Sequence, residues 1–207
     1  MNRLNRLVIL SIASAAVLCL ALRSEDSKHF QAAPPTEYSH QESEKVIVGA
    51  KPFDNADLVE SAFGKKIDFP KYGVVPILVV IENKRERALD LSSLEASLVA
   101  ADGRHANAVQ AEDLPFLGTT GKHPSQVGVH SPIPLPKKKN PLNAPEIGTR
   151  AFAAKMLPPG ESANGFFYFE ARPEAGDKLY LNGMRDARSG QELLYFEFPL
   201  QNAAQAQ

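Results

Sequence analysis

The longest apolar run beyond the N-terminal segment covers residues 72–83 (YGVVPILVVIEN) and is rich in valine and isoleucine. β-Branched side chains favour strands, and a short run without polar alternation is typical of a strand that is covered on both faces. We therefore expect the odd-numbered side chains from Ile77 to Ile81 to contact one layer of the protein and the even-numbered ones to contact another. Pro76 has no backbone N–H, so full pairing of this strand is expected to begin at Ile77.

Shorter strand-like patterns lie on either side of this run. They cover residues 45–50, 88–91, 94–100, 105–109, 151–157, 165–170, 178–181 and 192–198. In the last of these, Leu194, Phe196 and Phe198 alternate with the odd-numbered side chains, which predicts a half-buried antiparallel strand. We expect these three residues to supply the sheet that faces the long strand, with Phe167 and Phe169 packed on the same side of it.

A brief helix is predicted over residues 53–64, because Asp54 or Asn55 can cap its start and Gly64 can end it. The dipeptide 102–103 (DG) lies between two short apolar runs and predicts a hairpin turn. About seven short strands separated by Gly, Pro and Asn turns indicate an all-β fold. We expect an antiparallel β-sandwich over residues 44–200, with one short helix.

Residues 111–150 interrupt this series of short strands and turns. They hold six prolines between positions 124 and 145 and three glycines before position 130. A connection of this length is uncommon in a compact domain, so it is predicted to be either a functional loop or a disordered insertion. Residues 118–147 contain few large apolar side chains, and we expect them to contribute little to the core.

The first 22 residues have a basic start followed by an apolar segment, which is the anatomy of a secretory signal. As a helix the apolar segment would be about 24 Å long, shorter than a ~30 Å bilayer core, so a signal cleaved after Ala21 is favoured. Two alternatives are lipidation at Cys19 and an uncleaved membrane anchor whose apolar segment ends at Arg23. All three predict an exported protein that is periplasmic, associated with the cell envelope or secreted.

Two further segments are predicted to lack regular structure. Residues 23–43 are polar and aperiodic and are predicted to form a flexible linker, so that order begins near Glu44. Residues 201–207 are predicted to form a disordered tail.

Composition excludes several classes of function. The net charge is −1, and the chain after the first 22 residues holds 21 basic and 24 acidic residues, which argues against a nucleic-acid binder. Cys19 is the single cysteine and lies in the predicted signal, so disulfides and cysteine-ligated metals are excluded from the mature domain. No tryptophan is present, which gives weak evidence against a surface that stacks on carbohydrate.

The layout of four segments resembles a known class of domain. Residues 75–83 (VPILVVIEN), 101–103 (ADG), 157–162 (LPPGES) and 165–169 (GFFYF) follow one another as in immunoglobulin-like domains of exported bacterial proteins and lipoproteins, most of uncharacterised function. The resemblance implies an immunoglobulin-like β-sandwich and an extracytoplasmic setting. It implies no catalytic residue, because such domains have none in common.

Candidate chemistry is sparse. Residues 160–165 (GESANG) nearly match a serine-hydrolase elbow, but the serine precedes a strand instead of following one, and no second motif places triad partners. No metal-ligand spacing or cofactor motif is present, so we predict neither a metal nor a cofactor. The candidate binding surface consists of residues in the insertion that could contact an anionic or polar partner: His123, His130, Lys137, Lys138 and Lys139.

Two functions fit these observations. The first is a non-enzymatic module for binding, assembly or support at the bacterial cell envelope, with a protein or other envelope component as partner and with peripheral or N-terminal membrane attachment. The second is an exported enzyme or enzyme inhibitor whose site lies in residues 111–150. The aromatic strand at residues 166–169 leaves a further choice between core packing and an exposed binding stripe.

Overall fold

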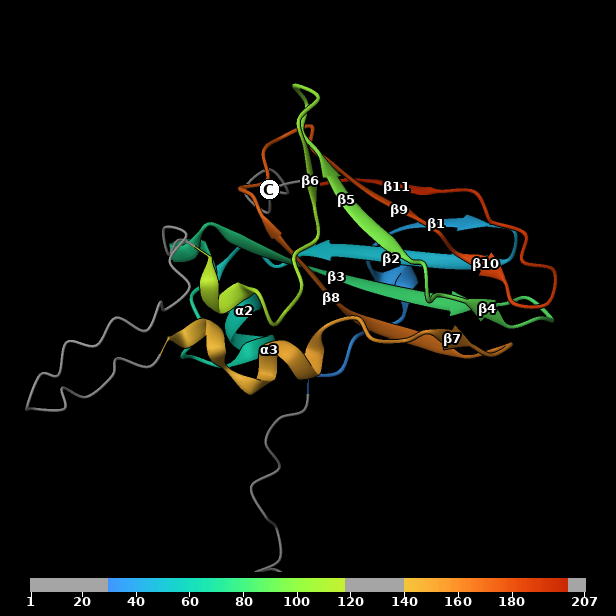
Figure 1. The fold of residues 1–207 in the computed structure, drawn as a ribbon, viewed down its shortest axis with the longest axis horizontal. Helices are drawn as coiled ribbons and strands as arrows, with labels where there is room; N and C mark the ends of the chain where they lie inside the picture. The colour runs from blue at the N-terminus through green and yellow to red at the C-terminus, as the bar shows by residue number, and fades with distance from the viewer. Residues whose placement is uncertain (1–29, 118–139, 201–207) are drawn as a thin grey trace, which may run out of the picture. The chain divides into compact units, whose positions relative to one another are not determined.

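The protein is described by a computed structural model that covers residues 30–117 and 140–200. The chain divides into two units, Met1–Gln31 and Ala32–Gln207, and the strands lie in the second. One antiparallel sheet has the order β1-β2-β3-β8 (Figure 1). Its strands are β1 (Ser39–Ser43), β2 (Val46–Pro52), β3 (Val74–Asn83) and β8 (Ser162–Glu170).

A second antiparallel sheet, of order β11-β9-β5-β6, packs against the first. Its strands are β11 (Phe196–Pro199), β9 (Lys178–Asn182), β5 (Glu95–Val99) and β6 (His105–Asn107). A small third sheet pairs β10 (Arg185–Asp186), β4 (Leu89–Asp90) and β7 (Met156–Leu157). The predicted all-β sandwich is confirmed, as is the hairpin at residues 102–103, which joins β5 to β6.

Strand β3 is buried on both faces, as its sequence predicts. Its odd-numbered side chains join the core between the two sheets, where Phe169 of β8 and Phe198 of β11 also lie. On the even-numbered face, Leu78 is opposite Phe166 of β8, whose ring lies 4.7 Å from that of Phe63. β3 therefore separates the core between the two sheets from a second apolar layer on its other face.

The second layer is built around helix α2 (Ala56–Phe63). The helix begins where predicted, because the Asn55 side chain accepts a hydrogen bond from the Leu58 N–H at 2.9 Å, and it ends at Gly64, whose φ is 82°. Buried Phe63 packs against aromatic rings from β8 and the loops around it. These rings belong to Phe69, Phe166 and Tyr168.

The expected start of pairing at Ile77 is correct on only one side of β3. Pairing with β2 begins at Ile77, but pairing with β8 already begins at Val74. The Pro76 carbonyl accepts a hydrogen bond from the Phe53 N–H, just past the end of β2, so the missing N–H of Pro76 also faces the β2 side. Because alternate residues of a strand direct their backbone groups to opposite neighbours, the ladder with β8 is unaffected.

The predicted linker at residues 23–43 is wrong at its C-terminal end. Residues Ser39–Ser43 form β1, which pairs with β2 through a two-residue turn at Glu44 and Lys45. Both turn residues have positive φ, 49° and 62°, the geometry of a tight hairpin turn that usually contains glycine or asparagine. The side chains of β1 are almost all exposed, so backbone pairing and not apolar alternation holds this strand.

The predicted irregular insertion is also partly wrong. Its described ends form short helices: η3 (Leu114–Phe116), η4 (Pro141–Asn143) and α3 (Pro145–Arg150). Leu142 and Ile147 are buried, so the expectation that residues 118–147 contribute little to the core fails for both. The Tyr168 hydroxyl donates a hydrogen bond of 2.7 Å to the Ile147 carbonyl, which ties α3 to β8. Residues 118–139 lie outside the described part of the chain.

The last predicted strand starts later than expected. Residues 192–195 do not join β11; instead the Leu193 N–H bonds to the Met184 carbonyl and Glu192 forms a bridge with Arg185. This shift exchanges the expected inside and outside positions of Leu193 and Leu194, while Tyr195 stays outside as predicted. Leu193 is therefore buried, whereas Leu194, predicted to face the core, is 66% exposed.

Candidate binding surface

None of the site residues predicted from the sequence can be placed. His123, His130 and Lys137–Lys139 fall within residues 118–139, and Cys19 falls within residues 1–29, and both ranges lie outside the described residues. Among residues 30–117 and 140–200, no group of three or more His, Cys, Asp and Glu side chains is placed to hold a metal ion. In the same part of the chain, no helix is long and apolar enough to cross a membrane. Of the two alternatives for the aromatic strand at residues 166–169, core packing is correct for Phe166, Tyr168 and Phe169, which are buried.

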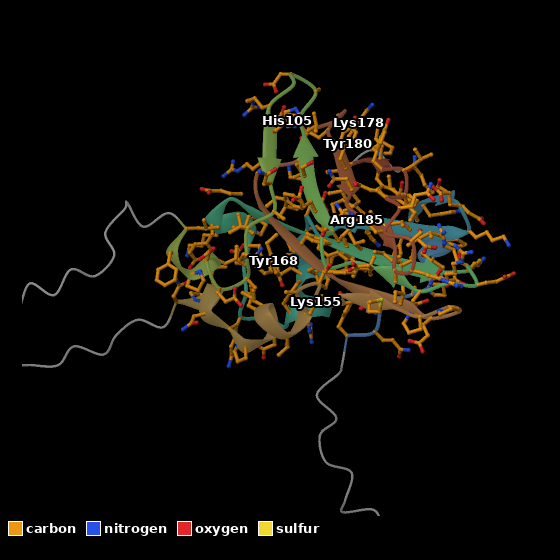
Figure 2. The ribbon with its side chains drawn as sticks, turned by 45° about the vertical axis from the view of Figure 1, so that its right-hand side comes forward. His105, Lys155, Tyr168, Lys178, Tyr180 and Arg185 are labelled. Atoms are coloured by element: carbon orange, nitrogen blue, oxygen red, sulfur yellow. The ribbon has the colours of Figure 1, made fainter. Side chains whose placement is uncertain are left out.

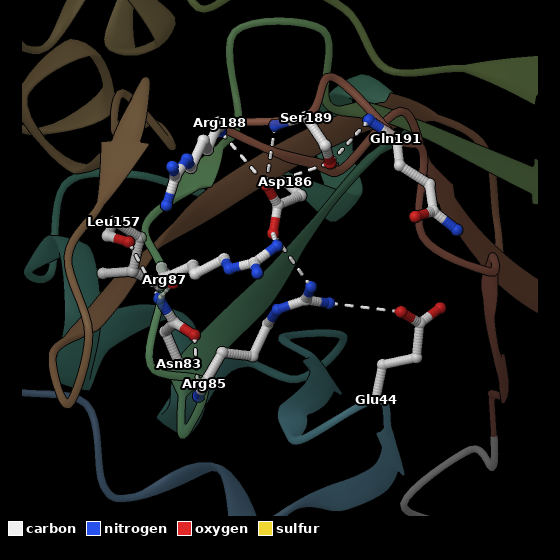
Figure 3. Close-up of polar contacts among 9 residues, drawn as sticks. All are labelled: Glu44, Asn83, Arg85, Arg87, Leu157, Asp186, Arg188, Ser189 and Gln191. Atoms are coloured by element: carbon white, nitrogen blue, oxygen red, sulfur yellow. Dashed lines mark hydrogen bonds and ion pairs between the residues drawn. The ribbon is translucent and has the colours of Figure 1, made fainter.

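A buried polar cluster lies where β3 ends and β10 begins (Figure 3). Asp186 is 2% exposed, and one of its oxygens accepts hydrogen bonds from the Arg188 N–H and from the Ser189 N–H and hydroxyl. Its other oxygen accepts from the Arg85 guanidinium at 3.0 Å and lies 3.8 Å from that of Arg87. Arg85 also bonds to Glu44 at 3.2 Å, so it links the β1–β2 turn to β10.

Asn83, the last residue of β3, is the second centre of this cluster and is fully buried. Its amide nitrogen donates to the carbonyls of Arg87, Leu157 and Pro158 at 2.9–3.1 Å, and its oxygen accepts from the Arg85 N–H at 3.0 Å. Because the polar groups of Asn83 and Asp186 have specific partners, this cluster is a structural joint.

The cluster should make stability depend on pH. Hydrogen bonds from Ser189, aided by Arg188 and by the charge of Arg87, lower the pKa of Asp186 from 3.8 to about 2 against the opposing effect of burial. A carboxyl group whose pKa is lower in the folded state adds stability above the unfolded pKa and loses it as the pH falls toward the folded pKa.

We therefore expect Asp186→Asn to be less stable than the parent above about pH 4, with a difference that shrinks between about pH 4 and pH 2. Urea unfolding of both proteins across this pH range measures the difference. A difference that stays constant over the range would show that the charge on Asp186 does not stabilise the fold.

The outward side of the β11-β9-β5-β6 sheet carries an exposed aromatic and apolar surface. We call this the tyrosine face and define it by Val99, Tyr180, Leu194 and Tyr195. Leu194 is 66% exposed and Tyr195 is 60% exposed, and the rings of Tyr180 and Tyr195 lie 5.9 Å apart at an angle of 33°. The face forms one side of a shallow hollow of about 650 Å³, with polar side chains around it. These are Ser97, His105, Asn182 and Glu192.

Charged residues beside the tyrosine face are paired with one another. The Lys178 ammonium lies 2.6 Å from Glu197, and Arg185 lies 3.7 Å from Glu192. Tyr180 also hydrogen-bonds to Glu197, and this bond, together with burial and the carboxylate charge, raises the pKa of the Tyr180 hydroxyl. Figure 2 shows His105, Lys178 and Tyr180 gathered at one end of the second sheet. The surface is therefore close to electrically neutral, and the Tyr180 hydroxyl is fixed in place.

A deeper groove of about 690 Å³ lies where the two sheets part, beside β5 and the segment leading to β7. The groove is open because small side chains line it: positions 96, 108, 151 and 154 are alanines. The stacked rings of Phe152 and Phe167, 5.3 Å apart, also line the groove. Its polar side chains include Ser92, Glu95, Asn107, Gln110 and Lys155.

Two backbone hydrogen bonds hold the walls of the groove against β8. The Val109 N–H donates to the Tyr168 carbonyl at 2.7 Å, and the Phe152 N–H donates to the Phe166 carbonyl at 3.0 Å. An added methyl group on Gly165 would lie 2.4 Å from the Phe152 Cα, so glycine is required for this close approach. The groove is thus part of the rigid sandwich.

Sequence patterns point only weakly to either surface. In the sequence, Tyr195 is only one position of an alternating pattern that predicts a strand. The alanines that line the groove lie in three separate segments of the chain. The one local signal is the adjacent pair Leu194 and Tyr195, since two neighbouring residues of a regular strand cannot both face the core.

Comparisons with known proteins give likenesses of overall shape alone. No family model matches the sequence, and no curated protein matches it significantly. A solved structure of a "putative lipoprotein (ycdA)" from Bacillus subtilis subsp. subtilis str. 168 has a TM-score of 0.41 and 11% identity, over 81% of this chain and 40% of that one. The secreted protein MPT63 from Mycobacterium tuberculosis has a TM-score of 0.34 and 14% identity, over 81% of this chain and 99% of that one.

This chain therefore spans less than half the length of the first of these structures. Both TM-scores are below 0.5, and neither likeness assigns a family or a function to this chain.

Proposed function

We propose that this chain is an exported, non-enzymatic immunoglobulin-like module that binds a component of the bacterial cell envelope through the tyrosine face. The observation that carries the proposal is the exposure of Leu194 and Tyr195, in the segment just before β11, beside Tyr180 of β9. Large apolar side chains gathered on one exposed face mark interaction sites, and tyrosine is enriched among the residues that dominate binding energy.

The non-enzymatic part of the proposal draws support from the environments of the ionisable groups. In the described residues, Asp186 and its arginine partners form a structural joint, and the charges beside the tyrosine face are paired with one another. The alternative is an enzyme or inhibitor site in residues 111–150. Buried Leu114, Leu142 and Ile147 favour a packing role for the described ends of that segment.

The binding test uses isolated bacterial envelopes and the full chain. We expect the parent protein to sediment with envelopes and the double variant Tyr180→Ala/Tyr195→Ala to bind at least about tenfold more weakly, as for residues that dominate an interface. Met156→Ala is the matched control, since Met156 is 54% exposed but lies on β7, away from the tyrosine face. Equal binding by the double variant and the parent would exclude this face as the binding surface.

Export is tested separately in a bacterial host. The basic start and apolar segment of residues 1–22 support processing and release from the cytoplasm. We expect Cys19→Ser to mature like the parent, with the new N-terminus at residue 22 in both proteins. Loss of a membrane-bound mature form in this variant would show lipidation at Cys19 instead, and an unprocessed cytoplasmic chain would contradict export.

A further inference from the structure

The tyrosine face and the groove are parts of one continuous surface. Ser97 of β5 and Asn182 of β9 line both hollows, so they connect the 650 Å³ hollow at the tyrosine face to the 690 Å³ groove. We call the combined surface the binding track. It runs from Tyr195 at one end, across Ser97 and Asn182, to Gln110 and Lys155 at the other. A surface of this form suits an elongated ligand better than a single compact molecule.

The side chains along the track provide two kinds of contact. Flat aromatic rings are present at both ends, with Tyr180 and Tyr195 at one and the stacked Phe152 and Phe167 at the other. Between and around them lie amide and hydroxyl groups, which can donate and accept hydrogen bonds without carrying charge. These belong to Ser92, Ser97, Asn107, Gln110 and Asn182.

The charges along the track balance. Glu192 pairs with Arg185 and Glu197 pairs with Lys178 beside the tyrosine face. In the groove, Glu95 and Lys155 contribute one charge of each sign. A strongly anionic or cationic chain would find no excess of opposite charge here, so the track is complementary to a neutral ligand.

Backbone pairing with a peptide strand is opposed at two neighbouring strands, β11 and β8, because backbone groups there already have partners. The Glu197 N–H of β11 donates to the Gln41 side chain at 2.9 Å. On β8, the carbonyls of Phe166 and Tyr168 accept from Phe152 and Val109. A ligand that lies on the outward side of the sheet is recognised mainly through side chains, unlike a peptide that would add to the edge strand β6.

We propose that the binding track holds a neutral, linear polysaccharide, which makes this polymer the envelope component bound under the proposed function. Sugar rings present C–H faces that pack on aromatic rings and hydroxyl groups that bond to amides and hydroxyls, and the track provides both kinds of partner. The absence of tryptophan is weak evidence against such a ligand, and it is offset by the exposed ring of Tyr195 beside the half-buried ring of Tyr180. Each hollow also falls in the size range of ligand sites, about 300–1,000 Å³.

The direct test is calorimetric titration of the full chain with cellohexaose, maltohexaose and chitohexaose, and with the matching disaccharides. We expect at least one hexasaccharide to bind at least about tenfold more tightly than its disaccharide, because only the longer chain spans both hollows. Tyr195→Ala and Gln110→Ala, at opposite ends of the track, should each weaken binding about tenfold, and Met156→Ala should leave it unchanged. Failure of all three hexasaccharides to bind, or binding that is insensitive to either track variant, overturns the inference.

A second experiment separates this inference from the proposed function. Envelopes that bind the parent chain are treated either with proteinase or with anhydrous trifluoromethanesulfonic acid, which cleaves glycosidic bonds and leaves peptide bonds intact. Loss of binding after the acid but not after proteinase supports a polysaccharide. Loss after proteinase, or survival of binding after both treatments, overturns the polysaccharide assignment while the tyrosine face remains a binding surface. No binding to untreated envelopes contradicts the proposed function itself.

Discussion

Alanine in place of either Ile77 or Leu78 is expected to lower the free energy of unfolding by about 2–5 kcal/mol, through lost burial and the cavity left behind. These neighbours point to opposite faces of β3, and both are at most 1% exposed. Ile77 lies in the core between the sheets, and Leu78 lies opposite Phe166 in the layer that contains α2. Urea unfolding of the two variants measures both costs.

The matched control is Leu194→Ala, which removes a similar side chain from the surface. Because Leu194 is 66% exposed, we expect its replacement to change stability by no more than ~0.5 kcal/mol. If either core variant fell within that range, one face of β3 would be open to solvent. The fold would then have a different central element.

The second large effect is expected from Asn83→Asp. The substitution replaces an amide that donates to three carbonyls with a carboxylate that repels them, at a position with no exposed surface. An uncompensated buried charge typically costs about 3–5 kcal/mol, and we expect a loss of that size at pH 7 in urea unfolding. Asn107→Asp makes the same chemical change on the exposed β6 and should cost no more than ~0.5 kcal/mol.

The pH dependence of the Asn83→Asp variant shows whether the buried charge causes its loss of stability. Burial against carbonyls raises the pKa of a carboxyl group, so the aspartate at position 83 should take up a proton more readily in the folded state. The difference in free energy of unfolding between this variant and the parent should therefore shrink as the pH falls from 7 to 4, because a protonated carboxyl can again donate one hydrogen bond. Asn83→Ala has no titrating group and should show a constant cost. A similar, constant cost for both variants would mean that lost contacts, and not charge, account for the effect.

The candidate site illustrates how little of a binding surface local patterns can reveal. Tyr180 and Tyr195 are separated by a turn through β10, and they lie together because β11 pairs with β9 in the sheet. The alanines of the groove come from β5, from the segment after β6 and from the segment before β7. No short-range pattern encodes the meeting of such distant positions.

The sequence by itself determined the elements whose stability is local or whose burial is complete. The uninterrupted Val and Ile run specified β3 as a strand covered on both faces, and Asn55 and Gly64 specified the limits of α2, since capping depends on residues within one turn. The tertiary structure decided the rest. Polar β1 is a strand because the backbone of β2 offers it a partner, and Ile147 is buried where α3 is tied to Tyr168 of β8. Leu142 is buried in η4, which contacts η3 from the other end of the insertion. Leu194 is exposed because Leu193 pairs with Met184, a contact set by long-range packing and not by the apolar alternation of residues 192–198, whereas the outward position of Tyr195 agrees with that alternation.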